Sequence, residues 1–138
     1  MIAVIQCAAR KRRDAGHLRR QDGKKVKFVA DPAIAPADTE YVYAHPDEMS
    51  DTGVSWRQVL VQYNASPANN PYGLLPASEL YDRPAYRQLT DRLGSSNVFI
   101  LSAGWGLIGA PFLTPDYDIT FNATTKRKGT LEVPTGTL

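Results

Sequence analysis

The sequence has few residues of the kinds that build disulfides and metal sites, and it has no long apolar run. Its 138 residues include one cysteine, Cys7, and two histidines. A single cysteine excludes an internal disulfide, and no Cys/His cluster has the spacing of a zinc site. No apolar stretch approaches the roughly 18 to 20 residues of a membrane-spanning helix. We therefore expect no metal, no other cofactor and no insertion into a membrane.

The N-terminus also lacks the layout of a secretory signal. In MIAVIQCAARKRR the apolar residues precede the charges, whereas a secretory signal has the reverse order and a longer apolar region. We therefore expect a cytoplasmic protein. A chain of this length with 43% hydrophobic residues can bury a core as one domain. We place that domain at residues 1–121, and an irregular or flexible tail, which shows no periodicity, at residues 122–138.

Charge is unevenly distributed along the chain. Residues 1–27 carry nine lysines and arginines against Asp14 and Asp22, whereas residues 28–123 carry four basic and eleven acidic side chains. A basic end on an acidic body favours an anionic partner such as a nucleotide or a nucleic acid. The same pattern is also typical of a solvated, mobile arm, and composition does not separate the two.

Hydrophobic periodicity predicts an α/β fold. Apolar runs predict buried strands at Met1–Cys7 and Asn97–Leu101, with shorter strands at Tyr41–Tyr43 and Asp118–Phe121. Helical spacing predicts helices at Trp56–Asn64, Pro76–Tyr81 and Pro84–Leu93, the first capped by Ser55 and the last ended by Gly94. Strands separated by helices favour a mostly parallel sheet covered by helices.

The basic N-terminal region is expected to form a loop and then a hairpin. Asp22-Gly23 lies between the extendable segments His17–Arg20 and Lys25–Ala30, and Asp-Gly is a common hairpin turn. We expect these two strands to be largely exposed.

The stretch Ser102-Ala103-Gly104-Trp105-Gly106-Leu107 follows a predicted buried strand. Its small residues would let backbone N–H groups approach an anion closely, and Trp105 would offer a face on which a base stacks. The Ser102 hydroxyl could donate to a phosphate or a sugar. The alternative is a tight turn that carries a core tryptophan. The pattern matches neither a dinucleotide-binding fingerprint, nor a phosphate loop, nor a nucleophile elbow.

Asp116 and Asp118 form a second candidate site. In an extended segment, residues two apart point to the same side, so the two carboxylates would share a face. One of them could act as an acid or base, or the pair could stabilise the positive charge that develops when a glycosidic bond breaks. Ordinary turn chemistry after Pro115, or an ion pair with the basic loop, would explain them equally well.

The first loop, Cys7-Ala8-Ala9-Arg10-Lys11, supplies a third candidate site. Arg10 and Lys11 follow a strand directly and could hold phosphates, and Cys7 could react as a thiol if it is partly exposed beside that charge. More commonly, a cysteine at a strand end is a small buried apolar residue. In open α/β sheets ligands bind beyond the carboxyl ends of strands, where this loop and the Ser102 loop both lie.

The three segments together resemble a known signature. ILSAGWGLI followed by LTPDYDITF resembles the LSA-aromatic-GLL…PYD pattern of the YaaA-like peroxide-stress proteins, and it resembles their small stand-alone bacterial and phage relatives more closely. Those relatives open with an apolar strand that ends in cysteine and is soon followed by lysine, as VIQCAARKR does. The chain departs from the larger members in two ways. It is too short for their added DNA-binding helices, and its tail does not resemble their helical continuation.

The resemblance implies an α/β fold with a site at Cys7, Lys11, Ser102, Gly106, Leu107, Tyr117 and Asp118. It also implies an association with DNA binding, stress response, phage defence or the metabolism of nucleotides and modified bases. We expect an enzyme that acts on a nucleotide or nucleic-acid base, by N-glycosidic bond cleavage or base exchange. Asp118, Asp116 and Ser102 would be catalytic, and Cys7, Arg10, Lys11, Gly104, Trp105, Gly106 and Tyr117 would bind substrate. The alternatives are a non-catalytic nucleic-acid binder that uses the basic N-terminal segment, and a ligand-sensing module without turnover.

Overall fold

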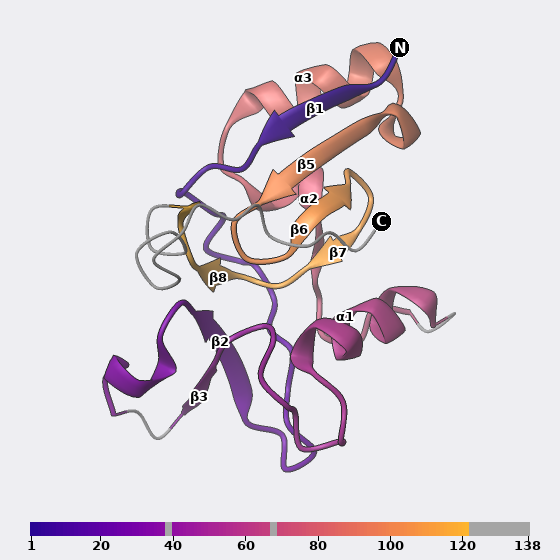
Figure 1. The fold of residues 1–138 in the computed structure, drawn as a ribbon. Coiled ribbons are helices and arrows are strands. Elements are labelled where there is room, and N and C mark those ends of the chain that lie inside the picture. Colours follow the sequence, from indigo (N-terminus) through magenta and orange to yellow (C-terminus); the bar gives the residue numbers. More distant parts are fainter. Residues whose placement is uncertain (38–39, 67–68, 122–138) are drawn as a thin grey trace.

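The computed structural model of the protein describes residues 1–37, 40–66 and 69–121 (Figure 1). The strands are β1 (Ala3–Gln6), β2 (Lys25–Val29), β3 (Tyr41–Ala44), β4 (Leu75–Pro76), β5 (Val98–Ser102), β6 (Gly106–Gly109), β7 (Leu113–Thr114) and β8 (Tyr117–Asp118). The helices are α1 (Trp56–Ala65), α2 (Ala77–Leu80) and α3 (Pro84–Leu93), with short 3-10 turns η1 (Pro32–Ile34) and η2 (Ser95–Asn97). The chain is therefore a small mixed α/β protein.

One sheet has the strand order β1-β5-β6. β1 and β5 run parallel, so that Val4 pairs with Phe99, while β5 and β6 run antiparallel. Figure 1 shows α3 behind β1 and β5, and α3 contacts both strands. The prediction of a strand at the N-terminus is confirmed, but the strand is not fully buried. It lies at the sheet edge, and Val4 on the face away from the core is 60% exposed.

A second sheet has the order β3-β2-β8, and both of its pairs are parallel. The predicted hairpin that leads into β2 is confirmed. Arg19 forms an antiparallel β-bridge with Lys25, and the backbone N–H of Arg20 donates to the Lys24 carbonyl. The expectation that its strands are exposed is wrong. Val26 and Phe28 are buried, since the parallel neighbours β3 and β8 place β2 in the middle of this sheet.

The expectation of a mostly parallel arrangement is also corrected. β5 and β6 form an antiparallel pair, and so do β4 and β7. Only three residues separate β5 from β6, and so short a connection can join antiparallel strands but not parallel ones. The arrangement is therefore mixed.

The helices follow local signals in the sequence. The Ser55 hydroxyl accepts a hydrogen bond from the Gln58 N–H and caps α1, as its position predicts. Pro84 begins α3, and Gly94 ends it with φ of 86°, a conformation that favours glycine. The predicted helix at Pro76–Tyr81 is present as the shorter α2.

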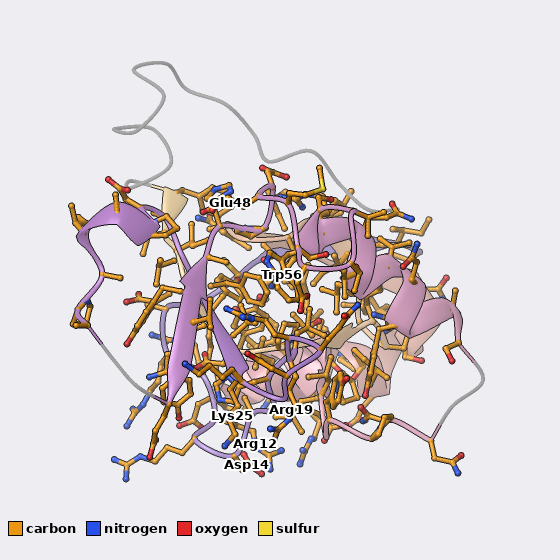
Figure 2. All side chains as sticks on the ribbon, turned by 90° about the horizontal axis from the view of Figure 1, so that it is seen from below. Arg12, Asp14, Arg19, Lys25, Glu48 and Trp56 are labelled. Carbon is orange, nitrogen blue, oxygen red and sulfur yellow. The ribbon has the colours of Figure 1, made fainter. Side chains whose placement is uncertain are left out.

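One hydrophobic core joins the sheets and helices. Its centre is aromatic: Phe28 of β2 contacts both Trp105 and Trp56, with ring centroids 4.8 Å and 5.9 Å apart. Figure 2 shows Trp56 among the interior side chains. In the described residues, every helix is too short or too polar to cross a bilayer. The tail that we predict at residues 122–138 lies outside the described residues.

Candidate functional site

The glycine-rich stretch after β5 is a β-hairpin turn. Ser102 pairs with Gly106 across the hairpin, and the intervening residues form the turn. The Ser102 hydroxyl accepts hydrogen bonds from the N–H groups of Gly104 (3.2 Å) and Trp105 (3.0 Å). Gly106 has φ of 82°, which a side chain would disfavour. In this structure the turn N–H groups that we expected to hold an anion are bonded to Ser102 instead.

Gly104 has a packing role against Tyr117. A Cβ atom at position 104 would lie 2.9 Å from the Tyr117 ring, closer than real contacts allow. The absence of a side chain therefore lets the hairpin turn lie directly on the tyrosine. Gly104 and Gly106 are both buried, so neither offers an open backbone surface to a ligand.

The expected stacking role of Trp105 is contradicted by its position. Its side chain is fully buried and packs edge-on against Phe28, so neither indole face is open to a ligand. Arg57 lies over the ring at 5.9 Å and donates a hydrogen bond to the Gly104 carbonyl. The indole N–H has no hydrogen-bond partner among the described residues. Trp105 is a core residue, which is the alternative that the sequence left open.

Ser102 is likewise unavailable to a phosphate. It is fully buried, and its hydroxyl donates to the Tyr117 hydroxyl at 2.8 Å. The Tyr117 hydroxyl in turn lies 2.7 Å from that of Tyr81. Burial is the main cause that raises the pKa of both tyrosines, so both remain neutral at physiological pH. The three hydroxyls form a buried hydrogen-bond network. Because Ser102 is part of this network, the expectation that Ser102 is catalytic is corrected.

A cavity of about 960 Å³ lies beside this network. Its walls come from segments far apart in the sequence: the first loop with Ala9 and Lys11, residues 27–31 and 34–36, Tyr43, and residues 116–118. Because β2 and β8 run parallel, Val29 pairs with Asp118 and the two strands end together at this cavity. The cavity therefore lies beyond the carboxyl ends of β2 and β8, and of the two loops at which the sequence predicts a site, the first loop lines it.

Lys11 lies in this cavity against the face of Tyr117. Its Nζ is 4.1 Å from the Tyr117 ring centroid and 5.9 Å from that of Tyr81, and it donates a hydrogen bond to the Ala9 carbonyl at 3.2 Å. Burial lowers the pKa of this amine, while nearby Asp116, Cys7 and Asp118 act in the opposite direction. Lys11 and Tyr117 are thus brought together, as the sequence predicts.

Both aspartates of the predicted pair line the cavity. Asp116 is half-buried, and Asp118 is exposed. Tyr117 between them lines the cavity too, so all three consecutive residues contribute to this wall. An exposed carboxylate beside the cavity can approach a bound ligand without losing a packed position.

Cys7 and Arg10 do not line the cavity. The half-buried Cys7 sulfur accepts a hydrogen bond from the Ala103 N–H at 3.3 Å, so it ties the first loop to the hairpin turn. Arg10 instead faces Asp82, with their charged atoms 3.5 Å apart. Of the expected binding residues, the cavity therefore contains Lys11 and Tyr117.

Other residues at the cavity were not predicted from the sequence. Lys27 of β2 and Asp31 add charge, while Tyr43 of β3 and Ile34 of η1 add apolar surface. Ile34 is 82% exposed, so its side chain is open to contact with a bound ligand. The alternation of Lys25, Val26, Lys27 and Phe28 was the available signal, but it does not show which strand β2 pairs with.

Comparisons of the chain with protein-family models, with curated proteins and with solved structures found no match. The resemblance to the YaaA-like proteins therefore stays a prediction. Within the described part of the chain, no group of three or more His, Cys, Asp or Glu side chains is arranged to hold a metal ion.

Proposed function

We propose that the cavity binds a phosphorylated nucleoside or a related nucleotide and that the protein cleaves its N-glycosidic bond or exchanges its base. The observation that carries this proposal is the convergence of Lys11 with Asp116 and Asp118 at one cavity, from opposite ends of the chain. Pockets for small ligands typically occupy about 300 to 1,000 Å³, a range that includes this one. A nucleotide has an anion, an aromatic ring and a cleavable bond, and the cavity offers a counterpart for each.

The proposed roles follow from the chemistry of the side chains. Lys27 and Lys11 supply positive charge for a phosphate. Tyr43 and Ile34 offer apolar surface for the base, in place of the buried Trp105. Asp118, with Asp116 as the second candidate, stabilises the positive charge that develops on the sugar or activates a water molecule.

Nucleic-acid binding is the second candidate, and the basic N-terminal segment favours it. Arg12 and Asp14 form an ion pair, while Arg19 lies beside Lys25 and donates to the Gly23 carbonyl. Figure 2 shows these four residues at the edge of that view farthest from Glu48. Arg20 also pairs with Asp22 at 3.0 Å. Because several arginines already face carboxylates, less positive charge is available for a polyanion, and we rank this function second.

The deciding experiment measures release of free base from nucleosides and nucleoside monophosphates by chromatography. We expect release by the wild-type protein, loss of release in Asp118→Asn, and an unchanged melting temperature because Asp118 is exposed. Asp91→Asn is the matched control, since Asp91 is an exposed carboxylate on α3 outside this cavity. Undiminished release in both Asp118→Asn and Asp116→Asn would remove the proposed mechanism.

A binding assay separates the two candidate functions. If the cavity takes a nucleotide, a nucleoside monophosphate should raise the melting temperature of the wild-type protein and of Asp91→Asn, but less so that of Lys27→Met. If the basic segment binds nucleic acid instead, affinity for an oligonucleotide should fall steeply with salt and should survive Asp118→Asn. A protein with the second behaviour and without the first would contradict the proposal.

A further inference from the structure

We propose that the amine of Lys11 forms an imine with an aldehyde-bearing phosphorylated sugar bound in the cavity. This inference deepens the proposed function and rests on it for the identity of the sugar. It assigns to Lys11 a covalent role that simple charge neutralisation does not require. The observations that carry it are the rigid attachment of Lys11, the surroundings of its amine, and the open cavity next to it.

The backbone around Lys11 is held on both sides. Lys11 forms an antiparallel bridge with Tyr81, the Arg12 N–H donates to the Leu80 carbonyl at 2.8 Å, and the Asp82 N–H donates to the Arg10 carbonyl at 3.0 Å. The residue therefore behaves as part of a short strand, although it lies in a loop. The fixed backbone limits the positions that the amine can take, and its contacts with the Ala9 carbonyl and the Tyr117 ring limit them further.

The amine itself is held without a direct ionic partner. Its contacts are the Ala9 carbonyl at 3.2 Å and the face of Tyr117 at 4.1 Å, and the described residues place no carboxylate within ion-pair distance of it. Partial burial lowers the pKa of the amine, and the fields of Asp116, Cys7 and Asp118 offset part of this effect. Only a neutral amine attacks a carbonyl, and desolvation is the usual way to produce one.

The covalent step balances without an oxidant or a metal. The amine lone pair forms a C–N bond to the aldehyde carbon, the carbonyl π electrons move to oxygen, and transfer of a proton from nitrogen to that oxygen gives a neutral carbinolamine. The hydroxyl group then takes up a second proton, relayed from solvent by a pocket carboxylate, and leaves as water. The product is a protonated imine. Asp118 is exposed at the cavity and can carry this proton.

The class of sugar follows from the rest of the cavity. Cleavage of an N-glycosidic bond frees the anomeric carbon, which opens to an aldehyde, so the product of the proposed reaction contains the required group. Lys27, whose Nζ lies 4.1 Å from the Tyr41 ring centroid, also lines the cavity and would turn toward a phosphate while Lys11 reacts. Ribose 5-phosphate, which has both an aldehyde form and a phosphate, is therefore a suitable probe.

The test is reductive trapping of the wild-type protein with ribose 5-phosphate and sodium cyanoborohydride, which delivers hydride to the imine carbon and makes the adduct permanent. Peptide mapping by mass spectrometry should find the adduct on Lys11 severalfold more often than on the exposed Lys24. Excess inorganic phosphate should reduce the Lys11 adduct and leave the Lys24 adduct unchanged. Equal labelling of all lysines, or no label on Lys11, would overturn the inference.

Lys11→Arg separates this inference from the proposed function. The variant keeps the positive charge but cannot form an imine, so the adduct should disappear. The matched Lys24→Arg variant leaves Lys11 in place and should keep the Lys11 adduct, and an undiminished total yield of adduct in Lys11→Arg would overturn the inference. Absence of base release in the wild-type protein would remove the proposed function, whereas trapping on Lys11 would still support the imine. Base release by the wild-type protein without an adduct on Lys11 would support the proposed function and overturn the imine.

Discussion

The hydroxyl of Tyr117 lies 2.7 Å from the hydroxyl of Tyr81, and both side chains are buried. This contact connects β8 to the end of α2, and Ser102 extends it to the hairpin turn. Lys11 lies over the Tyr117 ring, so the network fixes the surface against which the amine is held. The first prediction concerns the ionisation of these two phenols.

Stability should fall as the pH rises above the ordinary tyrosine pKa of 10.0. Burial raises the pKa of Tyr81 and Tyr117 in the folded protein, so above this pH the unfolded chain releases phenolic protons that the folded chain retains. The unfolded state is then favoured, by about 1.4 kcal/mol per pH unit for each such group. Urea unfolding at several pH values measures this slope. Tyr81→Phe should make it shallower, and a slope that does not change would contradict the assignment.

Gly104→Ala should destabilise the protein by about 1 to 3 kcal/mol, because the added methyl group would press on the Tyr117 ring. The ring has little freedom to move away, since its hydroxyl is bonded to Ser102 and Tyr81. Gly109→Ala is the matched control: its Cβ would lie 3.5 Å from Pro111, an ordinary contact. Denaturant unfolding compares the two variants. Equal stability of both would show that the hairpin turn does not lie on Tyr117 as described.

Trp105→Ala should cost about 3 to 5 kcal/mol of stability, as expected for truncation of a large core side chain. Trp105→Phe should keep more of the packing and leave ligand affinity unchanged, because no indole face reaches the cavity. Calorimetric unfolding measures the loss of stability in both variants, and ligand titration measures the affinity of Trp105→Phe. A Trp105→Phe variant with intact stability and greatly weakened nucleotide binding would restore the stacking role that the structure contradicts.

Ile34→Ser should weaken ligand binding with almost no effect on unfolding. The side chain is 82% exposed at the cavity, so its truncation removes little buried area from the folded protein. If the base rests on this side chain, the dissociation constant should rise by about tenfold, equivalent to about 1.4 kcal/mol. Met49→Ser is a suitable control, because Met49 is also exposed but lies outside the cavity. Equal affinities of both variants would place the base elsewhere.

The sequence predicts those parts of the fold that depend on local signals. Ser55, Pro84 and Gly94 mark the ends of α1 and α3 through capping and fixed backbone angles, and the structure has these helices at the predicted places. β6 is different. Its Gly106–Gly109 segment begins and ends with glycine, which is depleted in strands, and it becomes a strand because the turn folds it back onto β5. Local propensity does not contain that information.

The residues of the candidate site also differ in whether the sequence predicts their position. Lys11 lies in the loop after the predicted first strand, and the resemblance places that loop and the Tyr117-Asp118 pair at one site, so their proximity could be expected from the sequence. Lys27 and Tyr43 could not, because their position depends on the pairing of β2 with β3 and β8. For Trp105 the sequence leaves two readings open, for another reason. A large aromatic residue in a glycine-rich turn has the same sequence pattern whether its ring faces a ligand or the core.

The cavity lies between the loop that leaves β1 and the β3-β2-β8 sheet. Lys11 is carried by the loop that leaves β1, whereas Lys27 and Asp118 belong to the β3-β2-β8 sheet, and Figure 1 shows β8 between the two halves. A ligand that contacts both Lys11 and Lys27 would connect the loop after β1 to the β3-β2-β8 sheet. Amide protons in β1 and in β2 would then exchange with solvent more slowly and by similar factors, although the strands belong to different sheets.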